Sequence, residues 1–122
     1  MRSIKPALAA YMMLFTAAAS ADVPPAQKAE VEHLLAFVEN ASCTIIRNGK
    51  THDSADAVSH IKKKYAYFKS KISSTEDFIE LSATKSTLSG KYYMVSCGDG
   101  EQIKTRDWLL DELEEYRRNT GS

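Results

Sequence analysis

The sequence has few of the features that define membrane, nucleic-acid-binding or redox proteins. Its 122 residues include only two cysteines. They form no Cys-x-x-Cys pair, which argues against a redox-active dithiol or a cysteine-based metal site. Basic and acidic residues number 16 each, which argues against a general nucleic-acid-binding protein. Beyond residue 21 no apolar run approaches the roughly 20 residues that cross a bilayer, so we expect no membrane span there.

The start of the chain predicts a cleavable export signal. Two basic residues precede an apolar run over residues 7–19, and Ala19-Ser20-Ala21 has the small-x-small form that signal peptidase accepts. We expect cleavage before Asp22, so residues 1–21 would be a signal peptide and residues 22–122 a single globular domain. Without the two basic residues, 14 basic and 16 acidic side chains remain, a formal net charge of −2.

Both cysteines, Cys43 and Cys97, lie after the predicted leader. An exported chain with two cysteines usually joins them in one disulfide. Closing so long a loop is expected to stabilise the fold by about 4 kcal/mol in the chain-entropy model. The sequence therefore predicts a structural disulfide.

Four helices are expected from apolar periodicity and capping patterns. The first covers about 25–41, where Val31, Leu34, Leu35 and Val38 form one apolar stripe. The others begin near residues with good capping side chains. The expected starts are Asp53, then Ser73 or Ser74, then Thr105 or Asp107.

Three strands are expected between these helices. A β-branched run predicts a strand at 43–48, where Asn48-Gly49 marks a turn, and an aromatic and β-branched run predicts another at 92–97. Asp99-Gly100 is a hairpin signal that leads into a short strand at 102–104.

One antiparallel register between the expected strands 43–48 and 92–97 places three pairs of residues opposite each other. The pairs are Cys43 with Cys97, Ile45 with Val95, and Arg47 with Tyr93. The sequence thus predicts an α+β fold in which a small three-stranded antiparallel sheet, with 92–97 at its centre, packs against about four helices.

Five short motifs are spread over most of the chain after the leader. They are Arg47-Asn48-Gly49, His52 with Ala57, His60-Ile61-x-x-Lys64, Glu76-Asp77-Phe78-Ile79, and Ser89-Gly90-Lys91-x-Tyr93. Together they resemble the YfeK-like family of small exported bacterial proteins, a domain of unknown function. The resemblance implies an exported protein, periplasmic in a Gram-negative cell. It carries over no reaction.

A hydrolase is one reading of the polar residues. Asp56, His60 and Lys64 are spaced four residues apart, so a carboxylate one turn away can orient the imidazole as a general base. Ser86 or Ser89 would supply the nucleophile, although no Gly-x-Ser-x-Gly elbow is present. More commonly, a histidine on the side of a helix forms a hydrogen bond with a neighbouring residue and has no catalytic role.

A metal-binding accessory protein is another reading. Imidazole and carboxylate groups are suitable zinc ligands. The candidates are His33, His52 and His60, with Asp53 or Asp56. Their spacing matches no closed metal site, so we expect neither a metal nor a cofactor.

We favour a non-enzymatic binding module. Arg47 ends a strand near Tyr93, where its guanidinium can present itself to a carboxylate or phosphate ligand or form an internal ion pair. The expected binding surface combines Arg47, His60 and Lys64 with the segment from Ser86 to Tyr93, in which Ser86, Ser89 and Tyr93 are the candidate contacts. Its expected partner is an envelope protein or a cell-wall component.

Overall fold

The computed structural model describes residues 22–98 and 100–121. The expected signal peptide and Asp99 of the expected hairpin turn lie outside the described residues. The helices are α1 (Pro25–Asn40), α2 (Ser54–Phe68), α3 (Thr75–Ser82) and α4 (Thr105–Thr120), with a 3-10 turn, η2, at Lys69–Lys71. The strands are β1 (Thr44–Arg47), β2 (Lys50–His52), β3 (Met94–Ser96) and β4 (Ile103–Lys104). In this part of the chain no helix has the length and apolar character needed to cross a membrane.

The first three helices begin where the sequence predicts. Pro25 opens α1, where a missing backbone N–H is harmless. The Asp53 side chain caps α2 by accepting a hydrogen bond from the backbone N–H of Asp56. Ser74 caps α3 in the same way through the N–H of Asp77. These local signals confirm the predicted helical part of the α+β fold.

The predicted side-chain cap of α4 is wrong. The residue before this helix is Lys104, and no side chain caps the helix start. The backbone N–H of Thr105 instead donates to the carbonyl oxygen of Tyr93 over 2.9 Å. The chain therefore enters α4 directly from β4, and sheet pairing satisfies a donor that a cap would otherwise satisfy.

The sheet has four strands, so the predicted number of three is wrong. Its order is β2-β1-β3-β4, and every neighbouring pair is antiparallel. The unpredicted strand is β2, which pairs with β1 through a hairpin turn at Asn48 and Gly49. Both turn residues have positive φ, 50° and 79°, as a type I′ turn requires. The residues of β2 are Lys-Thr-His, which lack the apolar alternation that reveals a strand.

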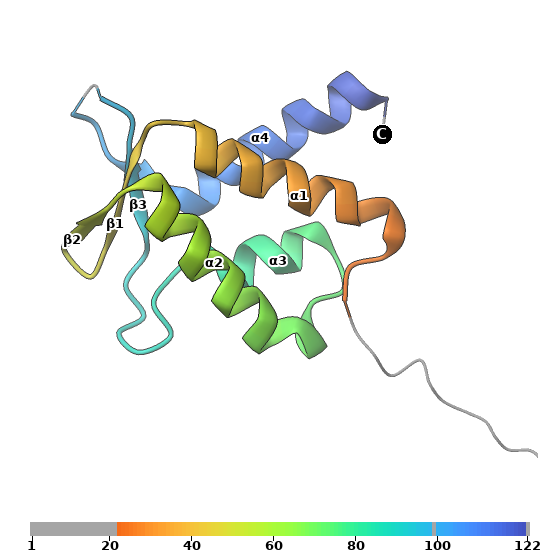
Figure 1. The fold of residues 1–122 in the computed structure, drawn as a ribbon, viewed down its shortest axis with the longest axis horizontal. Helices are drawn as coiled ribbons and strands as arrows, with labels where there is room; N and C mark the ends of the chain where they lie inside the picture. Colours follow the sequence, from red (N-terminus) through yellow and green to blue (C-terminus); the bar gives the residue numbers. More distant parts are fainter. Residues whose placement is uncertain (1–21, 99, 122) are drawn as a thin grey trace, which may run out of the picture.

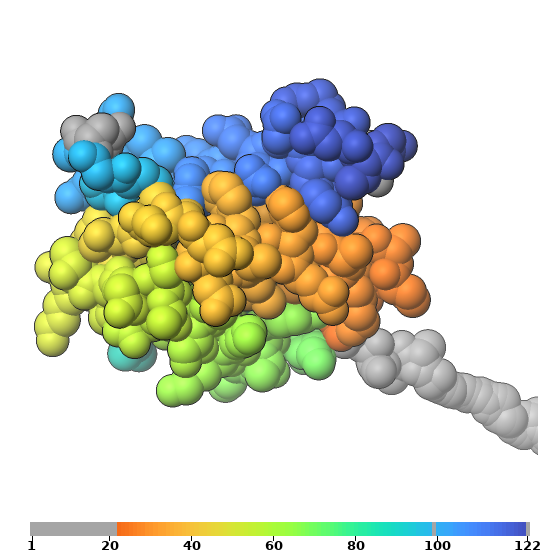
Figure 2. All heavy atoms as spheres, turned by 45° about the horizontal axis from the view of Figure 1, so that its top comes forward, coloured from red at the N-terminus to blue at the C-terminus, as the bar shows by residue number. Residues whose placement is uncertain are grey.

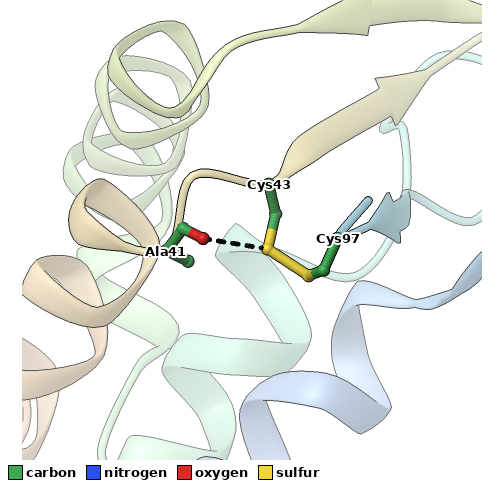
Figure 3. Close-up of a disulfide and its surroundings, with 3 residues drawn as sticks. All are labelled: Ala41, Cys43 and Cys97. Atoms are coloured by element: carbon green, nitrogen blue, oxygen red, sulfur yellow. Dashed lines mark hydrogen bonds between the residues drawn. A yellow bond between two sulfur atoms is a disulfide. The ribbon is translucent and has the colours of Figure 1, made fainter. Parts of the chain in front are cut away.

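The predicted register between β1 and β3 is present, but the ladder ends at Ile46 and Met94 and does not include the predicted pair of Arg47 with Tyr93. Ile45 pairs with Val95, and the disulfide joins Cys43 to Cys97 with a Cα separation of 4.3 Å (Figure 3). The Cys43 sulfur also lies 3.3 Å from the carbonyl oxygen of Ala41, at the end of α1. The disulfide therefore fixes β1 to β3 close to where the chain leaves α1.

The sheet lies at one end of the molecule, and the helices extend away from it (Figure 1). Helix α1 lies between α2 and α4, which appear on either side of it in Figure 2. The short α3 contacts all three of these helices and contributes the buried Phe78 and Ile79. Leu34 of α1 and Leu109 of α4 are equally buried, so one core connects all four helices.

A loop over residues 83–91, here called the serine loop, connects α3 to the approach to β3. Two backbone hydrogen bonds close it, from Ser86 N–H to the Lys91 carbonyl and from Tyr93 N–H to the Thr84 carbonyl, each 2.9 Å. The Lys64 ammonium on α2 donates to the Lys85 carbonyl over 2.7 Å. The loop is therefore held beside α2.

Candidate functional site

Arg47 is at the end of β1, and its guanidinium contacts two histidines. Nη1 donates to Nδ1 of His60 over 3.2 Å, and Nη2 donates to Nδ1 of His52 over 3.3 Å. Because arginine has donors and no acceptor, both ring nitrogens act as acceptors. The Nε atom of Arg47 is buried and has no hydrogen-bond partner among the described residues. Two imidazole nitrogens thus hold the guanidinium.

His60 connects Arg47 to Tyr93. With Nδ1 accepting from Arg47, the ring proton is on Nε2, which donates to the Tyr93 hydroxyl oxygen over 3.0 Å. Burial, followed by the positive charges of Arg47 and Lys64, lowers the pKa of His60 to about 4. The imidazole is therefore neutral near pH 7, and its lone pair is already in use.

Lys64 lies one turn after His60 on the same face of α2. Besides its bond to the serine loop, its ammonium donates to the Tyr93 hydroxyl oxygen over 3.3 Å. Burial, followed by the charge of Arg47, lowers the pKa of Lys64 from its ordinary value. Burial also raises the pKa of Tyr93, so its hydroxyl stays protonated at neutral pH. Because Tyr93 accepts from both His60 and Lys64, its own proton is available to a third group.

Ser86 and Ser89 hold the serine loop against the β1–β2 turn. The Asn48 side chain donates to Ser86 Oγ over 3.4 Å and accepts from Ser89 Oγ over 2.6 Å. Ser86 Oγ also accepts from the backbone N–H of Ser89 over 3.2 Å. Both hydroxyls are therefore occupied in fixing the loop, and neither contacts His60.

A cleft of about 480 Å³, here called the Arg47 cleft, lies between α2, the β1–β2 turn and the serine loop, and of the predicted site residues all but Ser89 line it. Its lining consists of the cations Arg47, Lys63 and Lys64, the polar residues Asn48, His60, Ser86, Thr87 and Tyr93, and the apolar residues Tyr67, Phe68 and Leu88. No described acidic residue lines it. None of the three cations has a carboxylate oxygen within 4.0 Å in the described part of the chain.

The expected interaction between Asp56 and His60 is wrong. The Asp56 carboxylate lies 3.8 Å from Nδ1 of His52, and its side chain is 69% exposed. His60 is instead oriented by Arg47 and Tyr93. The helical spacing allowed the Asp56 contact, but the arginine from the neighbouring strand occupies the ring nitrogen.

Three residues of the Arg47 cleft were missing from the predicted surface, apart from the turn residue Asn48. They are Lys63, Tyr67 and Phe68. They follow His60 at intervals of three, seven and eight residues, which is the spacing of one helix face. That periodicity was a usable signal. The loop residues Thr87 and Leu88 lie within the predicted segment from Ser86 to Tyr93, and the tertiary fold places them opposite α2.

The geometry does not favour a hydrolase. A serine nucleophile needs a base within hydrogen-bond distance, and neither loop serine contacts His60. With a pKa of about 4, His60 is also a weak base.

A zinc site is not favoured either. Arg47 donates hydrogen bonds to Nδ1 of both His52 and His60, so the lone pairs of these nitrogens are not available to a metal. The third candidate, His33, lies elsewhere, bonded to Glu112 over 2.7 Å. The described residues contain no group of three ligands placed to hold a metal ion.

Comparison with known proteins places the chain in a family. Over 82 residues it is 33% identical to the "Uncharacterized protein YfeK" of Salmonella typhimurium strain LT2, an alignment that covers 66% of this chain and 68% of the relative. No solved structure matches it significantly. The model of a family of unknown function, DUF5329, matches residues 25–117, which include every residue lining the Arg47 cleft. The chain therefore belongs to the DUF5329 family of unknown function and is similar to YfeK.

Proposed function

We propose that this protein is a non-enzymatic binding module of the bacterial envelope that captures an anionic group of a protein or cell-wall partner in the Arg47 cleft. The observation that carries the proposal is a cleft lined by three cations and by no described acidic residue. A cation removed from water is unfavourable unless a counter-charge accompanies it. A carboxylate or phosphate from a partner would supply that charge.

The guanidinium is held ready for such a group. Two imidazoles fix its position before any ligand arrives, so binding loses little side-chain entropy. Because imidazole carries no negative charge, the two rings orient the arginine without cancelling its charge. Lys64 and the free proton of the Tyr93 hydroxyl add donors on the same side of the cleft.

The envelope location rests on two features. The predicted export signal lies outside the described residues and stays a prediction. The Cys43–Cys97 disulfide supports it, because such bonds persist in oxidising compartments and are rare in the cytosol.

Site-specific photocrosslinking in intact bacteria tests the proposal. A photoreactive residue replaces Leu88, which is 98% exposed at the edge of the cleft, in the chain expressed from its full sequence. We expect a specific crosslinked product with an envelope protein or with cell-wall material. Arg47→Met should abolish it, because it removes the cation and keeps a side chain of similar length.

Arg118→Met is the matched control. Arg118 lies on α4, is 61% exposed and pairs with Glu115, so its loss changes net charge equally without touching the cleft. This variant should keep the crosslinked product. Equal products from both variants, at matched thermal stability, would contradict the proposal.

A further inference from the structure

The outer part of the Arg47 cleft is apolar. Among the described residues, four large apolar side chains are well exposed, and two of them line this cleft: Tyr67 at 79% and Leu88 at 98% exposure. Phe68 lines it as well and is partly buried against the core. Single exposed apolar residues are common, but a cluster beside a binding cleft marks an interaction surface.

The apolar residues come from two sides of the cleft. Tyr67 and Phe68 end α2, while Leu88 belongs to the serine loop. That loop is fixed by Lys64 and by the Asn48 side chain, which bonds Ser86 and Ser89. A ligand between the two sides would therefore meet apolar surface in a stable position.

We infer that the Arg47 cleft binds the free C-terminal carboxylate of a peptide chain whose last residue has an apolar side chain. This inference rests on the proposed function and specifies its ligand. In such a terminus the carboxylate and the apolar side chain share one Cα atom. One residue therefore presents an anion to Arg47 and Lys64 together with an apolar group to Tyr67 and Leu88.

Two further observations favour a peptide over other amphipathic anions. A cleft of about 480 Å³ is in the range of small-ligand sites, roughly 300–1,000 Å³, and suits one or two residues. The peptide groups of Thr87 and Leu88 make no hydrogen bond within the described structure, so they are free to pair with the backbone of a peptide. A fatty acid has no peptide groups with which to pair them.

Titration with four probes tests the inference. Three are acetylated pentapeptides of equal length: one ending in leucine with a free carboxylate, its C-terminal amide, and one ending in glycine with a free carboxylate. The fourth is decanoate. Binding is followed by calorimetry on the chain expressed from its full sequence. We expect the leucine acid to bind best, and the amide and the glycine acid each at least about tenfold more weakly.

Two variants assign each preference to its residues. Tyr67→Ser with Leu88→Ser should remove the preference for leucine over glycine and keep that for acid over amide. Arg47→Met should remove the preference for acid over amide. Arg47→Lys, which keeps the charge, should restore part of it.

The remaining outcomes separate the inference from the proposed function. If both free acids bind equally and the amide does not, the inference fails and the anion-binding function stands. If decanoate binds better than the leucine acid, the ligand is a lipid and the inference also fails. If the leucine acid and its amide bind equally, the inference and the proposed function both fail. If no probe binds, the inference fails, while the crosslinking experiment still decides the proposed function.

Discussion

Two arginines in this protein have opposite surroundings. Arg117 on α4 binds two carboxylates, with Nε 2.8 Å from Glu30 and Nη1 2.7 Å from Glu76. The Glu30 carboxylate is almost fully buried and also accepts from Thr75 over 2.6 Å. Arg47 on β1 donates through its Nη atoms to the imidazole rings of His60 and His52. Arg117 pairs directly with carboxylates, whereas no described carboxylate oxygen lies within 4.0 Å of the Arg47 guanidinium.

The difference indicates different roles. Arg117 connects α4 to α1 through Glu30 and to α3 through Glu76, so its charge stabilises the fold. Its hydrogen bond is the largest cause that lowers the pKa of Glu30. Arg47 is also fixed in place, but its charge faces a cleft. An arginine whose charge is balanced by carboxylates of the fold has little affinity for a further anion, whereas Arg47 retains that affinity.

The largest expected effect comes from the same substitution at both sites. Arg117→Met leaves the buried Glu30 carboxylate without its cation, so we expect a loss of about 3 kcal/mol in the free energy of unfolding. Arg47→Met removes two hydrogen bonds to imidazole rings and leaves no buried carboxylate without its cation, so the expected loss is about 1 kcal/mol or less. Chemical denaturation followed by circular dichroism measures both. Equal losses at the two sites would remove the distinction between the arginines.

The second prediction separates the two sites by pH. The folded-state pKa of His60, about 4, lies below the ordinary value of 6.5, so the unfolded chain binds more protons between these values. Its contribution to stability is complete above pH 6.5 and is lost as the pH falls towards 4. The lowered pKa of Glu30 acts only below its ordinary value of 4.5, where protonation weakens the pair with Arg117.

His60→Gln should therefore flatten the decline in stability between pH 6.5 and 4 and leave the steeper decline at lower pH. Glutamine cannot titrate, yet it keeps a hydrogen-bonding side chain at this position. Denaturant titrations at a series of pH values measure the change. An unaltered slope in the upper window would show that His60 is not the group that titrates there.

The sequence predicted those parts of the fold that local signals specify. The caps at Asp53 and Ser74 and the β1–β3 register depend on neighbouring residues or on one consistent pairing, and all three are present. Strand β2 was missed because its residues are polar and only the Asn48-Gly49 turn marks it. The start of α4 was misjudged because a distant carbonyl, that of Tyr93, satisfies its backbone.

The candidate site was less predictable because, like the start of α4, it depends on contacts between residues that are distant in the sequence. Single motifs pointed to Arg47, His60, Lys64 and Tyr93, and the structure places their side chains in one chain of hydrogen bonds. The absence of an acidic residue from the described lining of the cleft follows from tertiary packing, so no motif reveals it. Helical spacing suggested Asp56 as the partner of His60, because an argument from spacing within one helix does not include side chains from other elements.

The smallest expected effect tests which neighbour controls His60. Asp56 is 69% exposed and lies near His52, so water and salt screen its charge from His60. Asp56→Asn should leave the pKa of His60 unchanged within the error of an NMR titration of the ring protons. Arg47→Met should raise that pKa, because it removes the largest positive-charge contribution, but not to 6.5, since burial is the larger cause and persists. A larger shift in the aspartate variant than in the arginine variant would mean that Arg47 does not govern the imidazole, and that its charge is balanced by groups other than those seen around the cleft.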